Sequence, residues 1–116
     1  MLARRILVVD DEPLIAMLLG DWLVELGCEV VGPAHSVDAA LSLLNGSKVH
    51  GAFLDVSLGT NDSYLVAEAL RQLSVPVIFA TGHGADSIDA RFRDAGTLTK
   101  PFDFAAVENA VASFTT

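Results

Sequence analysis

The sequence has very few cysteines, few basic residues and no long hydrophobic run. Its one cysteine, Cys28, cannot form an internal disulfide, so nothing indicates an oxidising compartment. Seven Lys and Arg against 15 Asp and Glu give a net charge of −8. That charge argues against binding to nucleic acid and to anionic membranes. No apolar run reaches the length of about 18 residues that a membrane span needs, so we expect a cytoplasmic protein.

The rest of the composition is that of one folded domain. The chain has 116 residues, of which 52% are hydrophobic. This is enough to bury a core, and it leaves no room for a second folded unit. No internal repeat, linker or low-complexity tract interrupts the chain. We therefore expect one domain over residues 1–116.

Short apolar runs alternate with segments that have apolar residues at helical spacing. The predicted strands are residues 6–9, 29–32, 52–54, 75–80 and 98–99. The first of them, Ile6-Leu7-Val8-Val9, is apolar throughout, which is typical of a strand buried on both faces. Five strands alternating with helices predict an α/β fold, a doubly wound parallel sheet with helices on both faces.

Capping residues and apolar spacing place the helices between these strands. The first is expected to begin at Pro13 and to end at Gly27, and the second to begin after Ser36. A helix over 85–95 has few apolar anchors. The apolar stripe expected on the first helix is Leu14, Ile15, Leu18, Leu19, Trp22, Leu23 and Leu26. The residues expected to face inward on the last helix are Phe104, Val107, Val111 and Phe114.

Charged or hydroxyl-bearing residues stand where four of the strands end. Asp10 and Asp11 follow the first strand, Asp55 the third, Thr81 the fourth and Lys100 the fifth. In parallel sheets, ligands bind beyond the carboxyl ends of the strands, so these side chains are expected to converge. Three close carboxylates repel one another, and a hard divalent cation relieves that repulsion. All-oxygen ligation indicates Mg²⁺, whereas Zn²⁺ would favour His or Cys, and neither type stands at these positions.

The same residues can carry out phosphoryl chemistry. A carboxylate can act as a nucleophile and form an aspartyl phosphate. Lys100 would neutralise phosphoryl oxygens, and Thr81 could donate a hydrogen bond to one of them. No phosphate-binding GxxxxGK[ST] loop occurs, so the phosphate would be attached to the protein rather than carried on a bound nucleotide.

The ordered set Asp10-Asp11, Asp55, Thr81 and Lys100-Pro101-Phe102 resembles the receiver domain of bacterial two-component response regulators. The resemblance covers essentially the whole chain. It implies a flavodoxin-like, five-stranded parallel sheet with strand order 2-1-3-4-5. The tract Phe79-Ala80-Thr81-Gly82 further resembles the FAT GUY subfamily of receivers, many of which are single-domain proteins.

The resemblance also implies roles for individual residues. Asp55 would accept a phosphoryl group from a sensor histidine kinase. Asp11 and Asp55 would ligate Mg²⁺ directly, together with the backbone carbonyl of Ser57, and Asp10 would act chiefly through bound water.

Thr81 would be the switch hydroxyl, Lys100 would pair with the phosphoryl group, and the Lys100–Pro101 peptide bond would be cis. Receivers typically place Tyr or Phe three residues before the lysine, where this chain has Thr97. The aromatic partner of the usual switch is therefore missing.

Partners follow from the same resemblance. The kinase would dock near the first helix and the loop around Pro101. The output face would comprise the helix over 85–95, the strand at 98–99 and the last helix, where a downstream protein or a second copy of the chain would bind.

Other functions fit parts of the pattern. The chain could be a receiver-like adaptor that binds partners without phosphate, or a phosphate sink. A phosphatase on this fold would need DxDx[TV], whereas here Asp10 is followed by Asp11-Glu12-Pro13, and no hydroxyl- or glycine-rich flavin loop follows the first strand. Taken alone, the acids before Pro13 could also simply favour the helix dipole. We expect no enzyme with a separate substrate.

Overall fold

A five-stranded parallel sheet lies at the centre of the computed structural model, which describes residues 4–58, 61–82, 88–92 and 94–114. Its strands are β1 (Arg5–Val9), β2 (Glu29–Ala34), β3 (Gly51–Asp55), β6 (Val77–Thr81) and β7 (Gly96–Thr99). They are ordered β2-β1-β3-β6-β7, and every pair is parallel. The predicted order 2-1-3-4-5 is thereby confirmed.

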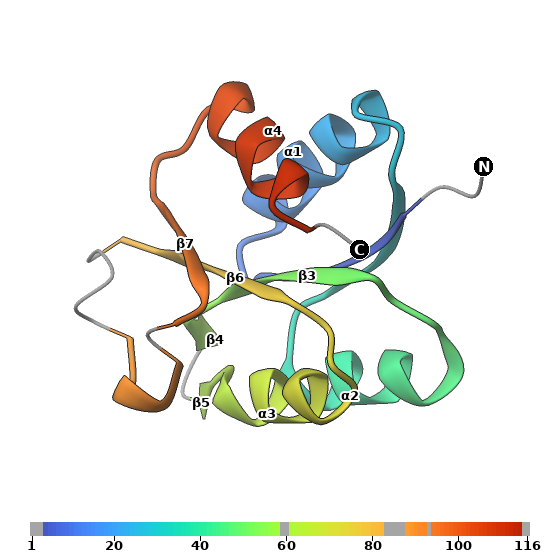
Figure 1. The fold of residues 1–116 in the computed structure, drawn as a ribbon, viewed down its shortest axis with the longest axis vertical. Coiled ribbons are helices and arrows are strands. Elements are labelled where there is room, and N and C mark those ends of the chain that lie inside the picture. The colour runs from blue at the N-terminus through green and yellow to red at the C-terminus, as the bar shows by residue number, and fades with distance from the viewer. Residues whose placement is uncertain (1–3, 59–60, 83–87, 93, 115–116) are drawn as a thin grey trace.

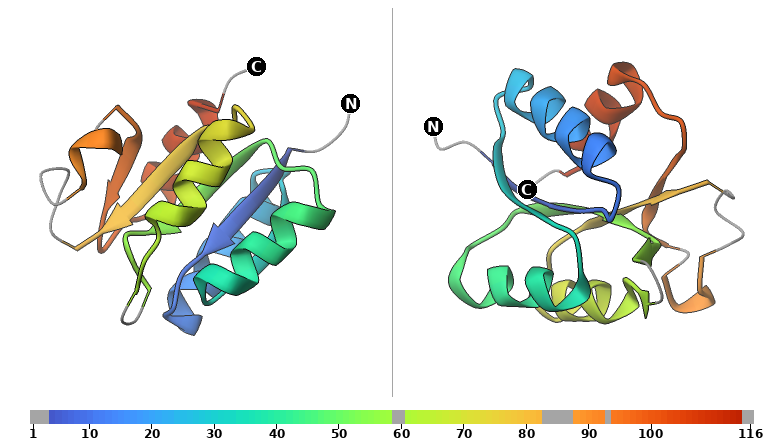
Figure 2. Two further views of the ribbon diagram at one scale, coloured as in Figure 1. Left: turned by 90° about the horizontal axis from the view of Figure 1, so that it is seen from below. Right: turned by 180° about the vertical axis from the view of Figure 1, so that it is seen from behind.

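The described helices cover both faces of the sheet (Figure 1). They are α1 (Pro13–Glu25), α2 (Val37–Gly46), α3 (Tyr64–Gln72) and α4 (Phe104–Ala112). α1 and α4 lie on one face and α2 and α3 on the other, as the two further views also show (Figure 2). The doubly wound architecture is therefore confirmed. None of the described helices is long and apolar enough to cross a membrane.

Alternate residues of each strand enter different cores. Ile6 and Val8 pack in the core beneath α1 and α4, whereas Leu7 and Val9 pack in the core above α2 and α3. All four are at most 1% exposed. Because both faces of β1 are covered, both sets of alternate positions must be apolar, which explains the unbroken apolar run.

The helix ends follow the expected chemistry. Pro13 occupies the first turn of α1, where its missing N–H costs nothing. Gly27, which follows that helix, has φ +83, a conformation that favours glycine. Ser36 caps α2, since its side chain accepts a hydrogen bond from the Ala39 N–H at 3.1 Å.

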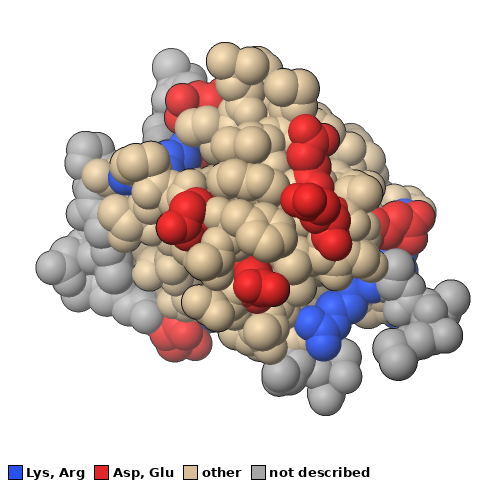
Figure 3. Space-filling view, turned by 90° about the horizontal axis from the view of Figure 1, so that it is seen from above, with Lys and Arg blue, Asp and Glu red and all other residues tan. Residues whose placement is uncertain are grey.

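The apolar stripe expected on α1 was partly wrong. Leu19 and Leu23 are buried, but Leu14 is 76% and Leu18 44% exposed. The buried stripe instead begins at Ala16, because α1 is apolar on most of its circumference and spacing alone does not select the face. From the side of α1 and α4, the surface is largely uncharged, with scattered carboxylates (Figure 3).

On α4, burial of Val107, Val111 and the following Phe114 is confirmed. Phe104 is only half-buried and packs edge-on against Trp22 at 6.0 Å.

The helix expected over 85–95 is not seen in the described part of that segment. Residues 83–87 and 93 lie outside the described residues. Ala90–Phe92 form a single 3₁₀ turn, η2, and β7 starts at Gly96, earlier than expected. The segment lacks the apolar periodicity that would bury a full helix, and Phe92, at 2% exposure, anchors it.

A short antiparallel hairpin also follows β3. It pairs β4 (Ser57–Leu58) with β5 (Asn61–Asp62), and the sequence did not indicate it.

Candidate functional site

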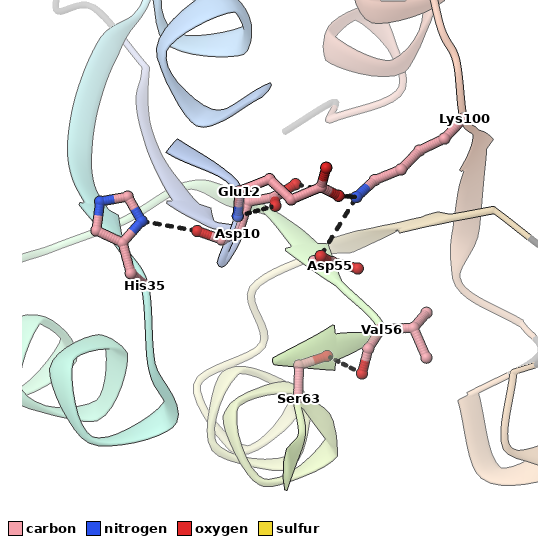
Figure 4. Close-up of polar contacts among 7 residues, drawn as sticks. All are labelled: Asp10, Glu12, His35, Asp55, Val56, Ser63 and Lys100. Atoms are coloured by element: carbon pink, nitrogen blue, oxygen red, sulfur yellow. Dashed lines mark hydrogen bonds and ion pairs between the residues drawn. The ribbon is translucent and has the colours of Figure 1, made fainter. Parts of the chain in front are cut away.

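The carboxyl ends of the strands bring the predicted site residues to one edge of the sheet. Asp10 follows β1, Asp55 ends β3, Thr81 ends β6 and Lys100 follows β7. Val9 of β1 is level with Leu54 of the adjacent β3, so the two aspartates leave the sheet side by side. Figure 4 shows Asp10, Glu12 and Asp55 gathered around the end of the Lys100 side chain.

Lys100 connects three carboxylates. Its Nζ lies 3.0 Å from Glu12 Oε1, 3.3 Å from Asp55 Oδ2 and 3.4 Å from Asp10 Oδ2. The Lys100 side chain is 15% exposed, that of Asp10 3% and that of Asp55 10%. The lysine therefore offsets repulsion between two buried carboxylates that would otherwise face each other.

This environment raises the pKa of Lys100. Burial lowers the pKa, but the hydrogen bond to Glu12 and the charges of Asp10 and Asp55 outweigh burial, and the pKa rises from 10.5 to about 12. A raised lysine pKa stabilises the fold fully below the ordinary value, and this contribution is lost as the pH rises through 12. The ammonium is thus charged throughout the neutral range.

Backbone contacts fix Asp10. Its N–H donates to the Ala34 carbonyl at 3.0 Å. Its own carbonyl lies 2.8 Å from His35 Nδ1, and because a carbonyl only accepts, that ring nitrogen carries the proton. The Asp10 carboxylate accepts the Glu12 N–H at 2.9 Å. His35 was not among the predicted site residues, since nothing in its spacing linked it to Asp10.

The loop after Asp55 is held by a second set of contacts. The Val56 N–H donates to the Ala80 carbonyl at 3.1 Å, which extends the β3–β6 pairing past the aspartate. The Val56 carbonyl accepts from the Ser63 N–H at 3.0 Å and from its hydroxyl at 3.4 Å (Figure 4). These bonds close the loop that carries Ser57, the residue next to Val56 in the chain.

Thr81 and Lys100 are joined through the backbone. The Lys100 N–H donates to the Thr81 carbonyl at 2.8 Å, and Thr81 is 3% exposed. The Lys100–Pro101 bond is cis, as the resemblance implied. Gly32–Pro33 is a second cis bond, which was not expected.

Four carboxylates could hold a metal ion together. Asp10, Asp11, Glu12 and Asp55 each offer an oxygen within 4.8 Å of the others. The donors are all hard oxygens and include no His or Cys, so the set fits Mg²⁺. Three of the four were predicted. Glu12 was missed, although it directly follows the aspartate pair, because its sequence position suits a helix N-terminus equally well.

Comparison with known proteins identifies the family. The model of the response regulator receiver domain matches residues 6–112. The chain belongs to this family. The receiver domain is 44% identical to SdrG of Sphingomonas melonis Fr1, whose solution structure superposes with a TM-score of 0.85 over 97% of this chain and 96% of that one. The BeF₃-activated conformation of SdrG gives 0.83 over 100% of both chains. The expected FAT GUY subfamily is consistent with these neighbours.

Longer relatives contain the same unit. The transcriptional regulatory protein PdtaR of Mycobacterium tuberculosis is 33% identical over 119 residues, which cover 96% of this chain and 58% of PdtaR. The phyllosphere-induced regulator PhyR of Methylorubrum extorquens is 35% identical over 96% of this chain and 43% of PhyR. The receiver domain thus spans about half the length of these curated relatives. A signalling role in a two-component system follows from the family.

Proposed function

We propose that Asp55 accepts a phosphoryl group from a sensor histidine kinase in a Mg²⁺-dependent reaction, and that phosphorylation changes how the domain binds a downstream protein. The observation that carries this proposal is the 3.3 Å contact between Lys100 Nζ and Asp55 Oδ2 within the carboxylate cluster. A cation already rests beside the carboxylate on which new negative charge would appear.

The transfer exchanges one bond for another. An oxygen of Asp55 attacks the phosphorus of a phosphohistidine, the P–N bond breaks, and the imidazole leaves with the bonding electron pair. Lys100 pairs with a phosphoryl oxygen, and the Thr81 hydroxyl donates to another. Asp10, Asp11, Asp55 and the Ser57 carbonyl would hold Mg²⁺, which when bound neutralises charge on the phosphoryl oxygens.

Two contacts with the phosphoryl group can supply most of the free energy that a conformational switch needs. Moving a population from 1:99 to 99:1 takes about 5.5 kcal/mol. A hydrogen bond to a charged group contributes about 1.5–3 kcal/mol, so Thr81 and Lys100 together would contribute about 3–6 kcal/mol. This supports switching although Thr97 replaces the usual aromatic residue.

The exposed end of α1 supports a kinase-docking role. Leu14, Met17 and Leu18 are 76%, 58% and 44% exposed. Beside them lies a hollow of about 330 Å³, whose lining is Glu12, Ile15, Leu18, Lys100, Pro101 and Phe102. A mostly apolar hollow at the mouth of the site suits a partner that must bring a phosphohistidine to Asp55.

The output face would lie around β7 and α4. Ala105, Asn109 and Ala112 are exposed on α4, and these small side chains allow the close approach of a downstream protein or a second copy. We place this signalling in the cytoplasm and assign the domain no separate substrate. Its only chemistry would be uptake and loss of its own phosphoryl group.

Intact mass after incubation with a small acyl phosphate tests the proposal. Wild type should gain one phosphoryl group with Mg²⁺ and none with EDTA, and Asp55→Asn should gain none. If neither an acyl phosphate nor an autophosphorylated kinase modified the wild-type domain, the proposal would fail. The phosphate-independent adaptor would then be the better account.

A further inference from the structure

Glu12 makes the shortest ion pair of Lys100, although it is the most exposed of the three carboxylates that contact this lysine. The distances from Lys100 Nζ are 3.0 Å to Glu12, 3.3 Å to Asp55 and 3.4 Å to Asp10. The Glu12 side chain is 57% exposed, against 3% for Asp10 and 10% for Asp55. The pair joins the start of α1 to the end of β7, 88 positions apart (Figure 4).

The backbone of Glu12 is fixed, so its contact with Lys100 depends on the side chain. The Glu12 N–H donates to Asp10 Oδ1 at 2.9 Å, and its carbonyl accepts the Ala16 N–H at 3.0 Å as α1 begins. The side chain makes no capping hydrogen bond at this N-cap position. The carboxylate can therefore leave Lys100 by rotating into solvent while the backbone stays in place.

An ammonium group has three N–H donors, and three carboxylates surround that of Lys100. Lys100 donates hydrogen bonds to Glu12 and Asp55, and Asp10 is an ion-pair partner, so a phosphoryl oxygen on Asp55 competes with Glu12 and Asp10 for the ammonium. Asp55 carries the phosphoryl group itself and is then no longer a free carboxylate, whereas Asp10 is buried, and a buried carboxylate that loses its cation bears a desolvation penalty. Glu12 is more than half exposed, so water can replace its partner at little cost.

On the basis of the proposed function, we propose that Glu12 is a positioning residue that competes with the phosphoryl group for Lys100. In the unphosphorylated domain Glu12 holds the ammonium at the mouth of the site. When Asp55 carries the phosphoryl group, Lys100 pairs with it and Glu12 turns to solvent. Glu12 thereby lowers the affinity of the site for the phosphoryl group.

Beryllofluoride, which activates the related SdrG, serves as the phosphoryl analogue. Its Kd is measured by calorimetry at saturating Mg²⁺ and about 0.15 M salt, where long-range charge effects are screened. Glu12→Gln should bind beryllofluoride about two- to fivefold more tightly, the range expected for an exposed ion pair. The matched control Glu25→Gln removes an exposed charge at the far end of α1 and should bind as wild type does.

Two further measurements separate competition from other roles. In a Lys100→Gln background, Glu12→Gln should not raise the affinity for beryllofluoride, because the ammonium for which Glu12 competes is absent. Because Glu12 also belongs to the carboxylate cluster that could hold Mg²⁺, Mg²⁺ affinity is measured separately for each variant without beryllofluoride, so that every beryllofluoride titration is run at saturating Mg²⁺. A gain in beryllofluoride affinity that persists without Lys100, or no gain at all, would overturn the proposal.

A double-mutant cycle on unfolding makes failure of this inference distinguishable from failure of the proposed function. Glu12→Gln, Lys100→Gln and the double variant should show a coupling of about two- to fivefold in the unfolding equilibrium constant, with no phosphoryl analogue present. A coupling near onefold would overturn the role of Glu12 alone. If the coupling were present but wild type did not bind beryllofluoride, the proposed phosphoryl binding would be contradicted. The proposed competition for Lys100 would then be contradicted as well.

Discussion

The hydroxyl of Tyr64 accepts a hydrogen bond from the backbone N–H of Asp89 at 2.7 Å. Tyr64 lies in the first turn of α3, and its ring stacks on that of Phe92 at 5.4 Å with an interplanar angle of 5°. It also meets Phe79 of β6 edge-on at 5.8 Å. One side chain thus joins α3, β6 and the segment that leads into β7.

This contact predicts that Tyr64→Phe loosens the segment around η2 while keeping the ring contacts. Loss of a hydrogen bond of about 1 kcal/mol corresponds to about fivefold faster exchange of the Asp89 amide. Hydrogen exchange followed by NMR measures it. Arg91→Gln, which removes an exposed ion pair to the Asp89 side chain at 3.2 Å, serves as a control and should change the exchange much less. Equal exchange in Tyr64→Phe and wild type would contradict the role of the hydroxyl.

Magnesium should stabilise the folded domain. The free energy of unfolding should rise by about 1.4 kcal/mol when Mg²⁺ is present at ten times its Kd, and EDTA should reverse the rise. Thermal unfolding with and without the ion measures this effect.

Asp11→Asn should reduce the stabilisation by Mg²⁺, because it removes one of the clustered carboxylates. Asp38→Asn removes an exposed acid of α2 instead and should leave the stabilisation intact. Equal stabilisation of both variants would argue that Asp11 takes no part in holding the ion.

Adding a side chain at position 51 should destabilise the folded domain. A Cβ on Gly51 would lie 2.7 Å from Cδ2 of Phe114, whose ring packs edge-on against Phe53 at 5.5 Å. Gly51→Ala should therefore lower the free energy of unfolding by about 1–3 kcal/mol, as overpacking does. Denaturation in urea measures the change.

Gly46→Ala is the matched control for that variant. A Cβ at Gly46, at the end of α2, meets nothing within 4 Å. Alanine there should leave stability unchanged or raise it by up to about 1 kcal/mol, because it restricts the unfolded chain. Similar losses for both variants would show that the contact with Phe114 is not the cause.

The alternation of strands and helices predicted the convergence of Asp10, Asp55 and Lys100, because the carboxyl ends of parallel strands must share one edge. The strand order was implied by the resemblance to receiver domains. The contacts of Glu12 and Tyr64 were not predicted from the sequence. Glu12 directly precedes Pro13, where an acid suits a helix N-terminus equally well, so its pairing with Lys100 was not predicted. The partner of Tyr64, the Asp89 N–H, is 25 positions away, and no periodicity links such a pair.

The pattern of apolar residues predicted burial and helices least well where a segment had either very many or very few apolar residues. α1 is apolar on several sides, so Leu14 and Leu18 were expected to be buried and are exposed. The 85–95 segment has too few apolar residues to define a face, and a single turn at η2 replaces the expected helix in its described part.

Mapping the phosphorylated residue tests the central claim most directly. The domain is incubated with acyl phosphate and Mg²⁺, treated with borohydride, digested and sequenced by mass spectrometry. An aspartyl phosphate is reduced to homoserine, so the account predicts homoserine at position 55 and at no other aspartate, including Asp10 and Asp11. Homoserine elsewhere in wild type, or unmodified Asp55 in protein whose intact mass has gained a phosphoryl group, would contradict it.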